Sequence, residues 1–176
     1  MTARAWLVVA LAAASAGVAQ GFGRFTLGVV LPAIRSDLGL SNTIAGSLAT
    51  ANVAAYLVGT LAVAMASSRI RLITIMKAGL LIAVGGQVLS AVAPNAPVLA
   101  VGMFCSGFGG AWVWIPTPVV ASSVFPPEKR GTAIGFLSSG MALSIVFTSQ
   151  LAGWVRRIWG DAGWRNVYVV QAAIGL

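Results

Sequence analysis

Arg24 is the residue of this sequence with the most evident chemistry, because it places a permanent cation inside an apolar stretch. The stretch covers residues 6–34, and Arg24 lies about ten residues, or ~15 Å of helix, before its end. Burying such a charge in a bilayer costs about 2.5 to 3.5 kcal/mol, so we expect Arg24 to face water or a partner. Gln20 lies four residues earlier on the same helical face, and the pair could bind a carboxylate or another anion. The structural alternative is that Arg24 bonds carbonyls exposed at a distortion near Gly21 and Gly23, or pairs with a carboxylate elsewhere.

Asn52 and Tyr56 form a second pair with the same i,i+4 spacing. Asn52 lies about eight residues into its own stretch, or ~12 Å deep, which is close to the depth of Arg24. The sequence therefore predicts a shared polar cluster in a central cavity, to which Thr148 could add a contact. The alternative is a hydrogen bond between helices, which contributes about 0.6 kcal/mol on average in membrane proteins.

Residue types that carry out catalysis are scarce. The chain has no histidine, one cysteine (Cys105), and three acids, Asp37, Glu128 and Asp161. No acid–base pair, metal-ligand set or disulfide can be assembled from them. We therefore predict a protein that is not an enzyme, with no catalytic residues, no metal site and no cofactor.

Composition indicates a polytopic, all-α membrane protein. Hydrophobic residues make up 59% of the chain, charged residues 8%, and the mean hydropathy is +0.94. Helices are expected because backbone groups in hydrocarbon must be satisfied within each segment. A cleaved signal peptide is an alternative for the first twenty residues, but apolar character resumes directly afterwards. We predict one transmembrane domain over residues 1–176, with helices at about 6–34, 44–66, 72–93, 98–124, 132–155 and an incomplete sixth at 164–176.

The formal charge of +8 is distributed over the short loops and forms no basic face, which argues against nucleic acid as a partner. With the N-terminus inside, six Lys and Arg residues lie on the cytoplasmic side and four on the outside. The positive-inside rule then predicts a multi-pass protein of the cell membrane with a cytoplasmic N-terminus.

Three loop motifs resemble those of major facilitator superfamily transporters. Residues 31–41 (LPAIRSDLGLS) resemble the link between helices one and two, and residues 125–131 (FPPEKRG) resemble the link between helices four and five. Trp164 and Arg165 resemble the pair that opens helix six. Residues 21–25 (GFGRF), together with Asn52, are similar to a poorly characterised bacterial branch of that superfamily.

The resemblance also identifies loop residues that could take part in gating. Between helices two and three the family carries an Asp-Arg pair and a Gly-Arg-Arg run, whereas here the basic residues Arg69 and Arg71 remain without the acid. In the link between helices four and five the corresponding candidates are Lys129 and Arg130. The gating ion pair of the family is therefore doubtful in this chain.

The resemblance implies the N-terminal six-helix half of a twelve-helix fold, truncated in its sixth helix. Such a protein moves a small solute by alternating access, and Arg24 suits an anionic solute. Its partners are the lipid bilayer, the solute and a C-terminal half missing from the chain. Two alternatives stay open. One is a non-transporting membrane fragment, and the other is a scaffold or channel component built from a helix bundle.

Overall fold

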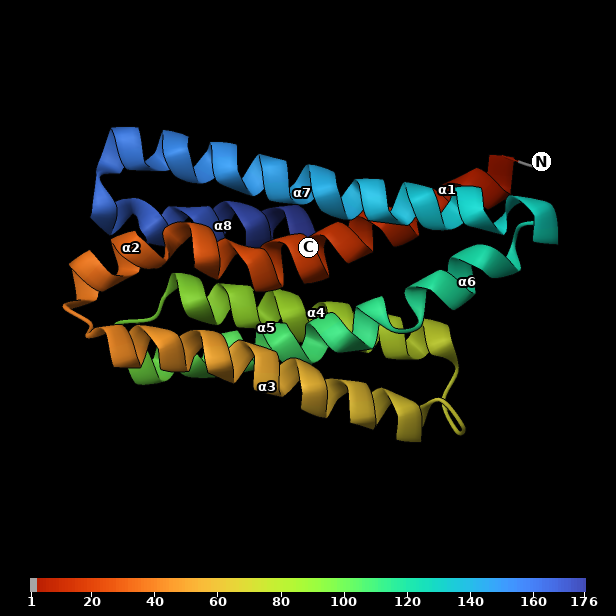
Figure 1. The fold of residues 1–176 in the computed structure, drawn as a ribbon, viewed down its shortest axis with the longest axis horizontal. Coiled ribbons are helices and arrows are strands. Elements are labelled where there is room, and N and C mark those ends of the chain that lie inside the picture. The colour runs from red at the N-terminus through yellow and green to blue at the C-terminus, as the bar shows by residue number, and fades with distance from the viewer. Residues whose placement is uncertain (1–2) are drawn as a thin grey trace.

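The structure, a computed structural model, describes residues 3–176 as a bundle of helices that run along its long axis (Figure 1). No strand occurs between Ala3 and Leu176. Five helical segments in this range are long and apolar enough to cross a membrane. The elements are α1 (Ala3–Ala16), η1 (Gly17–Phe25), α2 (Thr26–Leu38), α3 (Asn42–Ala66), α4 (Leu72–Ala91), α5 (Ala96–Trp114), α6 (Thr117–Ser123), η2 (Pro127–Lys129), α7 (Arg130–Trp159), η3 (Asp161–Gly163) and α8 (Trp164–Gly175).

The first spanning segment is one continuous helix of 36 residues from Ala3 to Leu38, in which η1 changes the hydrogen-bond pattern. This middle part is π-helical, with wider turns than an α-helix, and it contains Gly17, Gly21 and Gly23. At ~1.5 Å per residue, 36 residues exceed the ~30 Å hydrocarbon core, so the helix ends extend past it.

Local sequence signals account for the helix boundaries. The Ser41 hydroxyl accepts a hydrogen bond from the Ile44 amide at 3.3 Å, and the Asn95 side chain caps α5 by accepting from the Val98 amide at 3.1 Å. Gly39 ends α2 in the left-handed conformation, with φ 61°. Pro116 is the N-cap of α6, so the fourth spanning segment, Ala96–Ser123, divides into α5 and α6 next to a proline.

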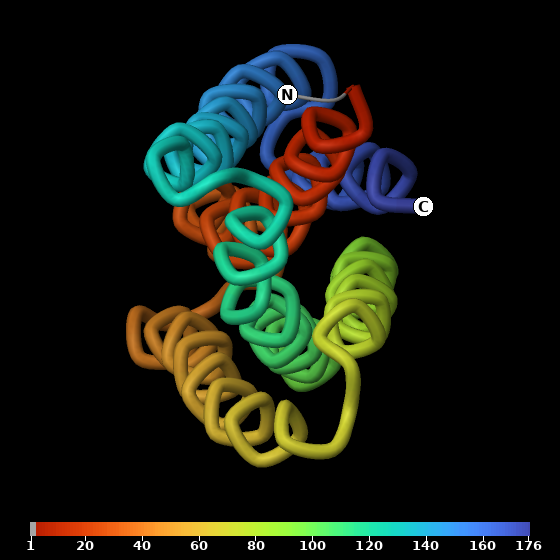
Figure 2. Tube along the Cα trace, turned by 90° about the vertical axis from the view of Figure 1, so that its right-hand side faces the viewer, coloured from red at the N-terminus to blue at the C-terminus, as the bar shows by residue number. Residues whose placement is uncertain are grey.

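Glycine allows α3, α4 and α5 to pack closely. A methyl group at Gly86 of α4 would lie 2.6 Å from the Ser106 backbone nitrogen of α5. At Gly107 of α5 it would overlap the backbone carbonyl of Asn52 on α3. Backbones therefore approach across both interfaces, as small residues permit in membranes. Figure 2 shows α3, α4 and α5 grouped on one side of the bundle and α1, α7 and α8 on the other.

The two ends of the bundle differ in charge. The start of α1, the α3–α4 loop and the α6–α7 loop share one end, and the α2–α3, α4–α5 and α7–α8 loops share the other (Figure 1). The N-terminal end carries six basic residues and one acid. The opposite end carries four basic residues and two acids, and both acids form ion pairs, Arg156–Asp161 and Arg165–Asp37.

Candidate functional site

Arg24 lies in the last turn of η1 and is half-buried. Its guanidinium carbon lies 4.7 Å from the centroid of the Tyr56 ring on α3, a cation–π contact that orients the planar group. Beside it is a hollow of about 210 Å³, lined by Arg24 and Asn52 with the apolar residues Phe25, Leu27, Leu31 and Val53. Within residues 3–176 the ion pairs are Arg156–Asp161 and Arg165–Asp37, so Arg24 has no counter-ion there.

Asn52 is brought next to Arg24, but its amide nitrogen is engaged with backbone. The side chain is 2% exposed, and Nδ2 donates to the Gly23 carbonyl at 3.1 Å and to the Met103 carbonyl at 2.8 Å. These bonds join η1, α3 and α5. The arrangement is the alternative given for Asn52 above, a hydrogen bond between helices. Asn52 also lines the hollow.

Gln20 and Thr148 lie away from the lining of the hollow. Gln20 is 3% exposed in η1, and no hydrogen bond joins it to Arg24 in the described part of the chain. Thr148 on α7 is fully buried and accepts a hydrogen bond from Nε2 of Gln171 at 3.0 Å. The Oε1 atom of Gln171 in turn accepts from the Thr26 hydroxyl at 3.0 Å. Thr148 therefore belongs to a buried polar triad that connects α2, α7 and α8.

Three buried polar residues were missed from the sequence. Thr26 and Gln171 complete the triad, and Gln87 on α4 is fully buried and donates from Nε2 to the Val18 carbonyl at 3.2 Å. Its Oε1 atom has no hydrogen-bond partner among the described residues. A glutamine inside an apolar stretch was the available signal, because polar residues at such positions are costly unless they are bonded or functional.

The basic loop residues Arg69, Arg71, Lys129 and Arg130 are all exposed at the N-terminal end of the bundle. The structure brings the two loops to the same end, but none of the four residues takes part in an ion pair within residues 3–176. They form a basic rim, and Glu128, the acid at this end, is in no ion pair with them within residues 3–176.

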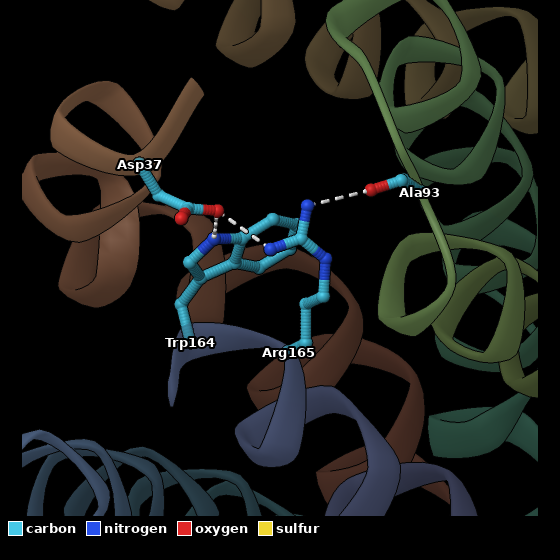
Figure 3. A network of polar contacts seen from close by, with 4 residues as sticks. All are labelled: Asp37, Ala93, Trp164 and Arg165. Atoms are coloured by element: carbon cyan, nitrogen blue, oxygen red, sulfur yellow. Dashed lines mark hydrogen bonds and ion pairs between the residues drawn. The ribbon is translucent and has the colours of Figure 1, made fainter. Parts of the chain in front are cut away.

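At the opposite end, one arginine connects three helices. Figure 3 shows Arg165, at the start of α8, between Asp37 of α2 and Ala93, which follows α4. Arg165 pairs with Asp37 at 2.6 Å and donates to the Ala93 carbonyl at 3.0 Å, and the Trp164 indole N–H donates to Asp37 at 3.0 Å. The Arg165 guanidinium also lies over the Trp164 ring, 4.3 Å from its centroid. We call these four residues the end clamp.

The sequence model described as "Major Facilitator Superfamily" matches residues 13–176 of the chain. The chain belongs to this superfamily. The identification predicted from the loop motifs is thereby confirmed, and the all-α fold predicted from composition is the fold observed for residues 3–176. Family membership points to a multi-pass membrane transporter rather than an enzyme, and it does not favour the alternatives of a non-transporting fragment, scaffold or channel component.

Relatives within the superfamily cover much of this chain. It is 28% identical over 148 residues to the putative uncharacterized transporter YgaY of Escherichia coli (strain K12), covering 82% of the chain and 36% of that protein. It is 28% identical over 159 residues to the probable galactarate/D-glucarate transporter GudP of Bacillus subtilis (strain 168), covering 87% and 34%.

A solved superfamily structure has the same fold. It is a bacterial homolog of the human lysosomal transporter Spinster, in an inward-facing and unoccupied conformation, with a TM-score of 0.81 and 20% identity. The match covers 99% of this chain and 41% of that one. This superfamily chain therefore spans about two fifths or less of the length of these relatives.

Proposed function

We propose that this chain is the N-terminal half of a secondary transporter that moves a small anionic solute by alternating access. The observation that carries the proposal is the guanidinium of Arg24, which has no ion-pair partner within residues 3–176 and is stacked on Tyr56 beside a hollow of about 210 Å³. A guanidinium held in this way presents a planar set of donors that matches a carboxylate. In the proposed complex, the solute replaces water around Arg24 and supplies the missing negative charge.

A C-terminal half would close the other side of the site. Solutes of such transporters bind near the bilayer midplane between repeats, and one repeat then rocks against the other. The carboxylates of this chain, Asp37, Glu128 and Asp161, lie at helix ends, so its membrane interior offers no acid for proton coupling. A coupling carboxylate would come from the C-terminal half, or transport proceeds without protons.

Two observations suggest the class of solute: the guanidinium of Arg24 in this chain and the name of one relative. GudP of B. subtilis has a name that refers to galactarate and D-glucarate, which are sugar acids with two carboxylates. Such an anion can form the bidentate contact that Arg24 offers. D-glucarate is therefore the first probe, and a monocarboxylate and a neutral sugar of similar size are the comparisons.

The test is uptake by the full-length protein that contains this chain, with membrane abundance measured in parallel. Arg24→Ala should raise the KM for D-glucarate at least tenfold, because hydrogen bonds to a charged group contribute about 1.5–3 kcal/mol. Arg24→Lys should recover little, since an ammonium lacks the planar fork. The matched control is Arg157→Ala, an exposed arginine of α7 outside any ion pair in residues 3–176. Near-normal uptake by Arg24→Ala would refute anion binding at this residue.

A further inference from the structure

The π-helical segment η1 is held at both ends by side-chain amides of neighbouring helices. Gln87 of α4 donates to the Val18 carbonyl near its start, and Asn52 of α3 donates to the Gly23 carbonyl near its end. In a π-helix each carbonyl is paired one residue further along than in an α-helix, a pattern that is rare outside short segments. The two amides add hydrogen bonds to carbonyls of this segment from two neighbouring helices.

The remaining faces of η1 are also fixed by close packing. A methyl group at Gly21 would overlap the Ser144 hydroxyl of α7, and one at Gly110 of α5 would lie 3.2 Å from the Ala19 carbonyl. One residue after η1 ends, Thr26 is bonded to Gln171 of α8. The backbone that carries Arg24 is thus held from α3, α4, α5, α7 and α8.

The direction of the Arg24 side chain depends on this backbone. If the segment rewound with α-helical hydrogen bonds, one residue fewer would be needed per wide turn. One residue corresponds to about 100° of rotation about the helix axis, so residue 24 would turn by up to that amount relative to α1. The guanidinium would then leave the Tyr56 ring and the wall of the hollow.

We propose that Gln87 and Asn52 are positioning residues that hold η1 in the register that places Arg24 on Tyr56 and beside the hollow. This inference rests on the proposed binding of an anion by Arg24. Gln87 carries the sharper prediction, because it is fully buried and is not part of the lining of the hollow. Its substitution therefore alters solute affinity through η1 and not by removing a contact to the solute.

The primary variant is Gln87→Met, which keeps the length of the side chain and removes the donor. In the full-length protein it raises the KM for D-glucarate at least fivefold and leaves the maximal rate, corrected for membrane abundance, within twofold. The matched control is Ser90→Ala on the same helix, equally buried, whose hydroxyl bonds within α4 to the Gly86 carbonyl at 2.8 Å. This control changes neither parameter by more than twofold.

Epistasis separates positioning from a general loss of stability. In an Arg24→Lys background, where the planar fork is absent, Gln87→Met changes the KM by less than twofold, because effects that pass through one residue do not add. If Gln87→Met raised the KM by the same factor with Arg24 and with Arg24→Lys, Gln87 would act independently of Arg24. That result would refute the inference.

A second measurement uses no solute. Phenylglyoxal modifies accessible guanidinium groups, and mass spectrometry of the peptide that contains Arg24 gives its rate, with exposed Arg35 as the internal reference. Gln87→Met and Asn52→Leu each change the Arg24 rate at least threefold and leave Arg35 unchanged. An unchanged Arg24 rate in both variants, or loss of the folded protein in both, overturns the inference. Undiminished uptake by Arg24→Ala, with an altered Arg24 rate in Gln87→Met, would instead refute only the proposed function.

Discussion

Substitution of Arg165 by methionine should destabilise the end clamp measurably. It removes the ion pair with Asp37, the hydrogen bond to the Ala93 carbonyl and the stacking on Trp164, and it keeps most of the apolar side chain. The Arg165 side chain is 31% accessible and that of Asp37 is 21% accessible, so the ion pair is only partly shielded from water. We assign about 1 kcal/mol to the ion pair and about 1 kcal/mol to the hydrogen bond with the Ala93 carbonyl. The stacking on Trp164 contributes about 0.5–1 kcal/mol.

The expected loss is therefore about 2–3 kcal/mol, which corresponds to a fall in Tm of roughly 4–12 °C for a chain of 176 residues and to a smaller fall for the longer full-length protein. The assay is thermal unfolding of the detergent-solubilised full-length protein, followed by size-exclusion chromatography of a fluorescent fusion. Asp37→Asn alone should cost less, and the double variant should be non-additive by about 1 kcal/mol. Arg157→Met at the same end is the control. If Arg165→Met and Arg157→Met lowered the Tm equally, the clamp would make no contribution.

Three further outcomes are expected. Gly107→Ala should reduce the amount of folded protein, since the added methyl group overlaps the Asn52 carbonyl, whereas Gly135→Ala on α7, with open space at its Cβ position, should accumulate normally; equal accumulation would contradict the packing argument. A reporter fused after Arg130 should behave as cytoplasmic and one fused after Asn95 as external, because the N-terminal end carries more basic residues, and the reverse pattern would overturn the proposed orientation. The 176-residue chain reconstituted alone should show no saturable D-glucarate uptake, and robust uptake would refute the proposal of a half-transporter.

Position along the helix axes was predictable from the sequence for Arg24 and Asn52, and rotation about those axes was not. Counting residues from the helix ends placed Arg24 and Asn52 at similar depths, and the structure indeed brings the Asn52 amide to the Gly23 carbonyl. The same counting could not show that this amide bonds to backbone, because that depends on the π-helical turns of η1 and on the close approach allowed by Gly107.

Thr148 shows the same limit. Its position in the fifth span suggested a contact in the cavity, but the face of α7 on which it lies is turned toward α8, where Gln171 meets it. Ser149 and Gln150 follow it directly and point to other faces of the helix, so periodicity gives no single direction for this part of α7. The partner is 23 residues away, and only packing of α7 against α8 brings the two together.

The end clamp also has a consequence for the order in which the chain assembles. Asp37 and Arg165 are separated by 128 residues, so the carboxylate is synthesised long before its partner. At about 5–20 residues per second, a ribosome needs roughly 6–25 s to cover that distance. During this interval α2 has already entered the membrane without the contact that joins its end to α8. The clamp can close only after Arg165, at the start of α8, has been synthesised, so it forms later than the contacts among α3, α4 and α5.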